Sequence, residues 1–213
     1  MRPPRRQVPR DQEASVFSAV LLRLCAASGA LGAALVDGEG ETVDYAGGLS
    51  PYDVRVAAAE WRIVLSVVDA TRATLWPDAR ELVIRSARRS FAIVRMSEGY
   101  AVVLVLPRGA FHVSRRALAE AEEALESEAG LAPLAGRAKL RWSSVEVRVA
   151  DDESRRPAFV WHEGLWRPIT ILGRFQSRDL ERREEGYLAR FATGPELLLV
   201  REPLGRWFAG RPS

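Results

Sequence analysis

The sequence predicts an α+β protein with a helix-and-sheet domain of element order αββαβββα, followed by a small all-β, barrel-like domain. Residues 11–131 alternate between segments with apolar residues at helical spacing and short strand-like runs, separated by glycine and proline. Residues 142–210 contain only short β-prone runs with turn signals between them. We therefore expect two domains joined by a linker at residues 132–141.

Charge is unevenly distributed along the 213 residues. Residues 1–10 carry four Arg and no acid, and three prolines interrupt them, so we expect a flexible basic arm. Residues 11–137 carry 13 Arg against 17 acids, whereas residues 138–213 carry 13 Arg and one Lys against 11 acids. The excess of positive charge therefore lies at the two ends of the chain.

Several classes of protein have no signature here. No run of 18 apolar residues occurs, and no small-residue cleavage site follows the basic start, so we expect a cytoplasmic protein with no membrane partner. Cys25 is the single cysteine, and His112 and His162 are the two histidines, for which we expect capping or turn roles. No phosphate-binding glycine loop occurs. We expect no enzyme, no cofactor and no metal site.

Two of the three predicted helices have clear boundaries. The first spans residues 11–28, with Asp11 as a plausible N-cap and Gly29 after its end, and buries Cys25 in its apolar face. Ser114 caps the third helix, and Gly130 follows it. The third helix should turn Leu118, Ala121 and Leu125 inward and its acids, Glu120, Glu122, Glu123, Glu126 and Glu128, largely outward.

Five strand-like runs complete this domain: residues 30–36, 42–46, 81–86, 91–96 and 100–106. The connectors inside the first pair and among the last three are short enough for antiparallel hairpins. A five-stranded antiparallel sheet covered by helices is the expected result.

The second predicted helix, residues 52–73, carries two apolar stripes that point in different directions. One stripe consists of Val54, Ala57, Trp61, Leu65 and Val68, and the other of Val56, Ala59, Ile63, Val67 and Ala70. A helix that is apolar over most of its circumference is usually buried on two sides. One side can pack on the sheet, and the other needs either a second copy of the chain or the C-terminal segment. We favour a second copy, with Val56, Ala59, Trp61, Ile63, Val67 and Ala70 as candidate contacts.

This pattern resembles the roadblock/LC7 domain, which is related to longin folds. The resemblance rests on the strand at residues 32–37 with its Asp-Gly-Glu-Gly turn, the pair Gly47 and Gly48, the apolar second helix, and the meander at residues 84–106 before an amphipathic helix. It covers residues 11–131. It implies a homodimer paired through the second helix, optionally also edge to edge through the sheets. It further implies a small Ras-like GTPase as partner, and no catalytic residue in this chain.

The C-terminal part is punctuated by aromatic residues, with a Trp-x-x-Val-Glu-Val opening at Trp142, a Phe-x-Trp centre at Phe159 and a closing Trp207. This is similar to a small bacterial domain family of unknown function, although Trp166 stands where that family often has Tyr. The similarity implies no activity.

Arginine and aromatic side chains in this part also allow a nucleic-acid surface of cationic groove and stacking rings. The candidates are Arg155, Arg156, Arg167, Arg174 and Trp166. The competing interpretation is that the tryptophans form the barrel core and the arginines a solvated surface. We therefore expect a non-enzymatic dimeric regulator or scaffold for a small Ras-like GTPase. A nucleic-acid-associated adaptor is the alternative, and a small-ligand sensor is a third hypothesis without a polar cluster to support it.

Overall fold

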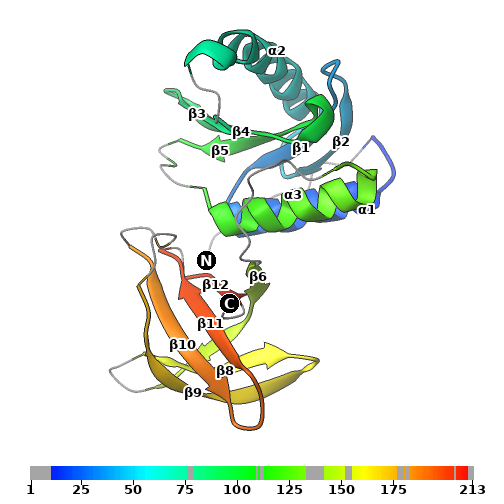
Figure 1. The fold of residues 1–213 in the computed structure, drawn as a ribbon. Helices are drawn as coiled ribbons and strands as arrows, with labels where there is room; N and C mark the ends of the chain where they lie inside the picture. The colour runs from blue at the N-terminus through cyan, green and yellow to red at the C-terminus, as the bar shows by residue number, and fades with distance from the viewer. Residues whose placement is uncertain are drawn as a thin grey trace. The chain divides into compact units, whose positions relative to one another are not determined.

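The computed structural model describes residues 11–75, 79–108, 110, 113–132, 142–151, 155–176, 180, 183–203 and 205–210. The predicted basic arm, residues 133–141 of the predicted linker and His112 lie outside the described residues. The chain divides into two compact units, Met1–Arg137 and Ala138–Ser213 (Figure 1).

The first unit has the predicted order αββαβββα. Its elements are α1 (Val16–Ser28), β1 (Gly32–Val36), β2 (Thr42–Gly47), α2 (Pro51–Leu75), β3 (Glu81–Arg85), β4 (Arg89–Arg95), the 3-10 turn η1 (Ser97–Gly99), β5 (Ala101–Pro107) and α3 (Arg115–Ala129). The five strands form one antiparallel sheet in the order β2-β1-β5-β4-β3. Helix α2 covers one face of the sheet, while α1 and α3 lie together on the other (Figure 1).

The centre of this sheet is buried on both faces. All five residues of β1 and the first six of β5 are buried. Continuous apolar runs such as Ala101–Leu106 are typical of strands that are covered on both sides, since neither set of alternating side chains meets water. The sheet is therefore the middle of three layers, and α2 is the single described helix on its side.

The start of α1 differs from the sequence prediction. Ser15 is the N-cap: its Oγ accepts a hydrogen bond from the Ser18 N–H (3.2 Å), and the Ser18 Oγ accepts one from the Ser15 N–H (2.8 Å). Asp11, predicted as the cap, instead accepts hydrogen bonds from the Tyr45 hydroxyl and from Arg55 (2.9 Å). The hydrogen bond from Tyr45 lowers the pKa of Asp11. Because its side chain binds Tyr45 and Arg55, which are distant in sequence, Asp11 does not cap the helix.

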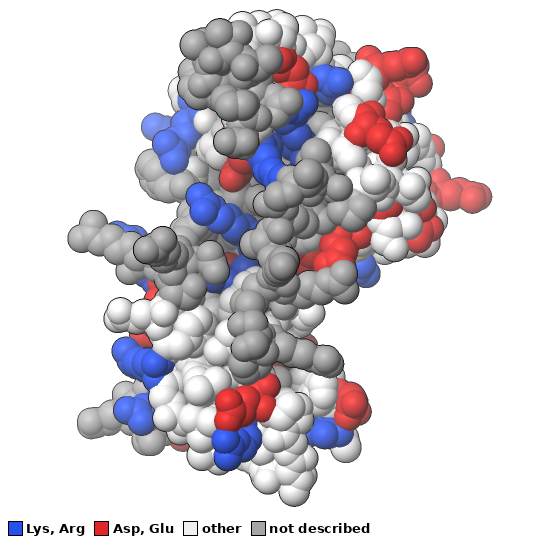
Figure 2. Space-filling view, in the orientation of Figure 1, with Lys and Arg blue, Asp and Glu red and all other residues white. Residues whose placement is uncertain are grey.

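Helix α3 begins and ends as predicted, with the Ser114 Oγ accepting from the Ala117 N–H (3.1 Å) and Gly130 in the left-handed conformation. Glu126, predicted to point outward, is 2% exposed, and Arg116 is also buried. The buried arc of α3 is therefore wider than its apolar stripe. Figure 2 shows exposed acidic side chains gathered on one side of the first unit.

Cys25 packs inside the first unit, as the sequence predicts. Its side chain is 6% exposed, its Sγ lies 3.9 Å from the Ala46 carbonyl oxygen, and burial raises the pKa of the thiol to about 12. We expect a thiol reagent at about pH 8 to label native Cys25 only as fast as the unit opens, because the thiolate is the reacting form. Absorbance-monitored labelling with and without denaturant measures this, and rapid labelling of the native protein would contradict the buried placement.

The second unit is entirely β in its described residues. Its strands are β6 (Trp142–Val145), β7 (Val147–Val149), β8 (Pro157–His162), β9 (Leu165–Arg174), β10 (Glu185–Phe191), β11 (Glu196–Arg201) and β12 (Trp207–Gly210). They form one antiparallel sheet in the order β6-β12-β11-β10-β9-β8-β7. The buried core on its inner side consists of Val160, Tyr187, Ala189, Phe191, Leu197, Leu199 and Trp207.

The two edges of this sheet are formed by one bent stretch of chain. Only Glu146 separates β6, which pairs with β12, from β7, which pairs with β8. At the bend, the Glu146 carbonyl oxygen accepts a hydrogen bond from the Trp161 N–H (2.9 Å). The sheet therefore curls almost onto itself, consistent with the predicted barrel-like domain.

His162, predicted as a turn residue, ends β8 instead. Its ring stacks on Phe191 with centroids 5.2 Å apart. The turn after it is made by Glu163 (φ 52°) and Gly164 (φ 80°), a two-residue hairpin loop in which both residues have positive φ. Within the described residues, no helix is long and apolar enough to cross a membrane.

Candidate functional site

Helix α2 has one apolar face against the sheet. Val54, Ala57 and Leu65, all from the first predicted stripe, are buried at 2%, 8% and 3% exposure. Val54 and Leu65 belong to one core cluster with Ala58, and α2 contacts β1, β2 and β5. This face accounts for the attachment of α2 to its own domain.

The second predicted stripe lies on the opposite side of α2 and is uncovered in the single chain. Ile63 is 68% exposed and Val67 is 63% exposed, while Ala59 and Ala70 are also exposed and Val56 is half-buried. Since residues 56, 59, 63, 67 and 70 recur at three- and four-residue steps, they form one continuous line along the helix. We call this line the outer stripe of α2.

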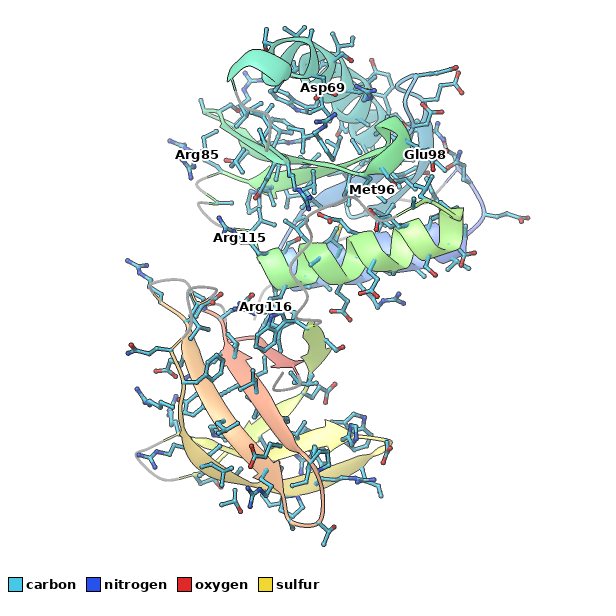
Figure 3. The ribbon with its side chains drawn as sticks, in the orientation of Figure 1. Asp69, Arg85, Met96, Glu98, Arg115 and Arg116 are labelled. Atoms are coloured by element: carbon cyan, nitrogen blue, oxygen red, sulfur yellow. The ribbon has the colours of Figure 1, made fainter. Side chains whose placement is uncertain are left out.

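Two polar contacts fix the rotation of α2 on the sheet. The Arg62 guanidinium donates hydrogen bonds to the carbonyl oxygens of Asp37 (3.2 Å) and Gly38 (2.8 Å) in the β1–β2 turn. Asp69, labelled in Figure 3, pairs with Arg95 of β4 at 3.1 Å. Both contacts lie beside the sheet-facing side, so they hold the outer stripe pointing away from the domain.

Trp61 is the exception among the six candidate contact residues. Its ring packs on Phe91 of β4, with centroids 4.7 Å apart and planes at 45°, and belongs to the sheet side of α2. Leu82 and Ile84 of the edge strand β3 lie on the same side of the sheet and are only half-buried. The main sheet contacts of α2 are with β1, β2 and β5, so this outlying part of the sheet is less well covered.

The sheet edge beside this region is open in the single chain. In the described parts of the chain β3 pairs only with β4, and its Val83, which points to the other face, is 41% exposed. An unpaired edge strand offers backbone N–H and C=O groups to a further strand. The outer stripe and the β3 edge are thus two surfaces of the first unit that have no cover or partner strand among the described residues.

The five candidate nucleic-acid residues do not form one patch. Trp166 and Arg167 lie near the start of β9, and Arg174 ends that strand about 23 Å away, at about 3.3 Å per residue. Arg167 is ion-paired with Glu163, and the Arg174 guanidinium lies 5.6 Å from the centroid of the Tyr187 ring. Arg155 and Arg156 are exposed in the β7–β8 connection.

The structure instead places other side chains beside Trp166. Trp161 of β8 meets it edge to face, with ring centroids 5.4 Å apart, and the Arg148 guanidinium of β7 lies 4.0 Å from the centroid of the Trp166 ring. Phe159 lies on the same side as Trp161, two residues away on β8. The sequence could have indicated this surface, because side chains alternate along a strand and an inward Val160 places Phe159 and Trp161 outward.

Side chains that could bind a metal ion or act in catalysis are few in the described part of the chain. No group of three or more His, Cys, Asp or Glu side chains that could hold a metal ion occurs among those residues. Of the two histidines, only His162 is described, and its Nε2 lies 3.9 Å from the Glu163 carboxylate on an exposed hairpin.

Comparisons with known proteins return similarity to solved structures alone. No protein-family model and no curated protein matches the chain. MglB of Myxococcus xanthus is 17% identical, with 56% of this chain and 98% of that chain covered and a TM-score of 0.48. The gliding protein MglB of Thermus thermophilus is 24% identical, with 54% and 89% covered and a TM-score of 0.46. A roadblock/LC7 domain from Streptomyces avermitilis is 15% identical, with 53% and 93% covered and a TM-score of 0.43. These neighbours are therefore MglB and roadblock/LC7 domains, each matched over about half of this chain.

Proposed function

We propose that this chain is a homodimeric, non-enzymatic regulator or scaffold that binds a small Ras-like GTPase. The observation that carries the dimer is the outer stripe of α2, with Ile63 and Val67 each more than three-fifths exposed on a helix already attached to its sheet by the opposite face. In a monomer, this side of α2 would be expected to be polar.

The composition of the outer stripe is suited to packing against a helix. Ile and Val have lower helix propensity than Leu, Glu or Lys, so at exposed helix positions they bring no advantage to a monomer. Burying each such side chain contributes about 1.5–3 kcal/mol. Ala59 and Ala70 flank the larger Ile63 and Val67, and small residues beside large ones let side chains of a second helix interdigitate.

In a two-fold symmetric dimer, each residue of the outer stripe contributes to the interface once from each copy. An isologous interface places the same patch of both copies together, so the apolar gain of one stripe is doubled. A stable interface buries about 800 Å² per partner, which is more than one line of side chains provides. The exposed Tyr52 and Val64 beside the stripe, and the half-buried Leu82 and Ile84 at the β3 edge, supply the adjoining apolar surface.

The GTPase partner follows from the roadblock resemblance of residues 11–131. Such a regulator acts by binding one conformation of the partner's switch loops more tightly than the other. Its own residues then need no catalytic role. The composite surface that binds the GTPase would exist only in the dimer.

State-dependent binding is the expected outcome for this partner. The full chain should bind a Ras-like GTPase encoded by the same genome with affinities that differ at least about tenfold between the forms loaded with GDP and with a non-hydrolysable GTP analogue. Titration of the purified GTPase carrying a fluorescent nucleotide measures both affinities. Ile63→Glu should weaken the tighter complex, whereas Leu22→Glu, at a 57% exposed position of α1, should not. Absence of a complex in both nucleotide states would remove the GTPase from the proposal while leaving the dimer to be judged separately.

A further inference from the structure

One side of the second unit carries aromatic rings that its core does not use. Register places Arg148 opposite Phe159 and Trp161 opposite Trp166, and residues directly opposite each other in antiparallel strands point to the same side. Val147 and Val160, which alternate with them, point into the core. Arg148, Phe159, Trp161 and Trp166 therefore form one outer face on β7, β8 and β9, which we call the aromatic face.

Two of these rings are well exposed to solvent. Trp161 is 42% exposed and Phe159 is 41% exposed, whereas Trp207 of the same unit is 6% exposed within the core. Apolar side chains that form a contiguous exposed patch, unlike single exposed ones, are typical of a surface that binds another molecule. Figure 2 shows charged side chains scattered rather than gathered on the viewed side of this unit.

Arg148 adds a cation that has no carboxylate partner within the described residues. Its guanidinium lies over the Trp166 ring. A guanidinium stacked on a ring keeps its N–H groups free at its edges, where they can take a phosphate in two parallel hydrogen bonds. Arg155 is exposed and also lacks a carboxylate partner among the described residues. The acid nearest in sequence to Arg148 is Glu146, which is exposed.

We propose that the aromatic face binds single-stranded nucleic acid, with bases stacked on Phe159 and Trp161 and a phosphate held by Arg148. Side chains two residues apart on a strand are about 6.6 Å apart, which is about twice the rise of one stacked nucleotide. Two bases separated from each other can therefore each take one ring. Bases of a duplex remain stacked on their neighbours and cannot do so.

The charge of this part of the chain fits a polyanion. Residues 138–213 carry 14 basic and 11 acidic side chains. A proline-rich peptide would also pack on aromatic rings, but it carries no anionic group to pair with Arg148. This site is distinct from the outer stripe of α2, so it stands or falls independently of the proposed dimer and its GTPase.

Fluorescence anisotropy of a labelled oligothymidine of about 15 nucleotides, titrated with the full chain at about 50 and 200 mM salt, tests this site. Trp161→Ala and Phe159→Ala should each weaken binding about tenfold. Arg148→Ala should weaken binding and lower the slope of log K against log salt by about 0.7. Matched controls are Leu172→Ala, an exposed apolar residue near the end of β9, and Arg23→Ala, an exposed arginine of α1; both should bind as the unchanged protein does.

Three results would overturn the proposal. These are absence of oligothymidine binding by the unchanged chain at the lower salt, unchanged affinity in both aromatic variants, or equally tight binding of a duplex of the same length. Binding of a proline-rich peptide through these side chains without oligothymidine binding counts as the first result. If Trp161→Ala does not fold by circular dichroism, Phe159→Ala and Arg148→Ala decide the question.

Discussion

Replacing Ile63 by glutamate is expected to convert the dimer into a monomer. Ile63 is the middle residue of the outer stripe, so in a two-fold interface each copy would bury a carboxylate against the other without a compensating cation. Removing an apolar contact and burying an unpaired charge should raise the dimer dissociation constant at least about 100-fold, corresponding to about 2.7 kcal/mol. Sedimentation equilibrium at micromolar concentration should show twice the chain mass of 23.6 kDa for the unchanged protein and the single mass for the variant.

The matched control introduces the same charge at another exposed apolar position. Leu22 is 57% exposed, and its helix α1 lies on the opposite side of the sheet from α2 (Figure 1), so Leu22→Glu should leave the dimer intact. Far-ultraviolet circular dichroism should be unchanged in both variants, because neither residue is part of the core. A monomeric unchanged chain, or equal dissociation in both variants, would exclude the outer stripe as the interface.

Replacing Gly47 by alanine is expected to destabilise the first unit strongly. Gly47 ends β2 with φ at +121°, a conformation that residues with a side chain rarely adopt. A Cβ there would lie 2.5 Å from the Gly32 Cα and 2.6 Å from the Leu31 carbonyl oxygen, both backbone atoms of the paired strand region. The chain can relieve this clash only by separating β1 from β2. We expect a loss of about 3 kcal/mol or more, which for a chain of this length lowers Tm by about 6–12 °C.

Gly48 provides the control one residue away. Its φ is not positive, a Cβ there would meet only the Leu31 carbonyl oxygen at 3.9 Å, and its N–H donates to that same oxygen at 2.8 Å, a bond that alanine keeps. Gly48→Ala should therefore change stability by less than about 1 kcal/mol, because reduced freedom of the unfolded chain offsets small strain. Thermal and urea unfolding compare the two variants. A Gly47→Ala variant that is as stable as Gly48→Ala would contradict the predicted clash at Gly47.

The sequence predicts the first unit well because its elements are defined by local signals. Gly29, Ser114 and Gly130 mark helix ends where the structure has them, and the two apolar directions of α2 follow directly from helical spacing. The predicted start of α1 was wrong because the outcome depends on Tyr45 and Arg55, which lie 34 and 44 residues from Asp11. No pattern near Asp11 contains that information.

The candidate contact residues of α2 also divide into those that helical spacing places correctly and one whose position depends on a residue distant in sequence. Five of the six share the outer side of α2 because one spacing relates them, but Trp61 turns to the sheet because Phe91 provides a ring to pack against. In the second unit, short runs indicated strands correctly, yet the surface depends on which side of each strand faces the inside of the curled sheet. Trp161, which the competing interpretation placed in the barrel core, is therefore exposed beside Trp166. Two of the five predicted surface residues, Arg167 and Arg174, lie toward opposite ends of β9.

Oxidative cross-linking of a single cysteine at position 63 tests the central claim most directly. In either a parallel or an antiparallel two-fold pairing of the outer stripes, the middle residue lies next to its own copy, and a disulfide requires Cα atoms within about 7 Å. In a Cys25→Ala background, Ile63→Cys is predicted to give a covalent dimer, and Leu22→Cys is predicted to remain monomeric on a non-reducing gel. Covalent dimer from Leu22→Cys but not from Ile63→Cys, or from neither, would contradict pairing through α2.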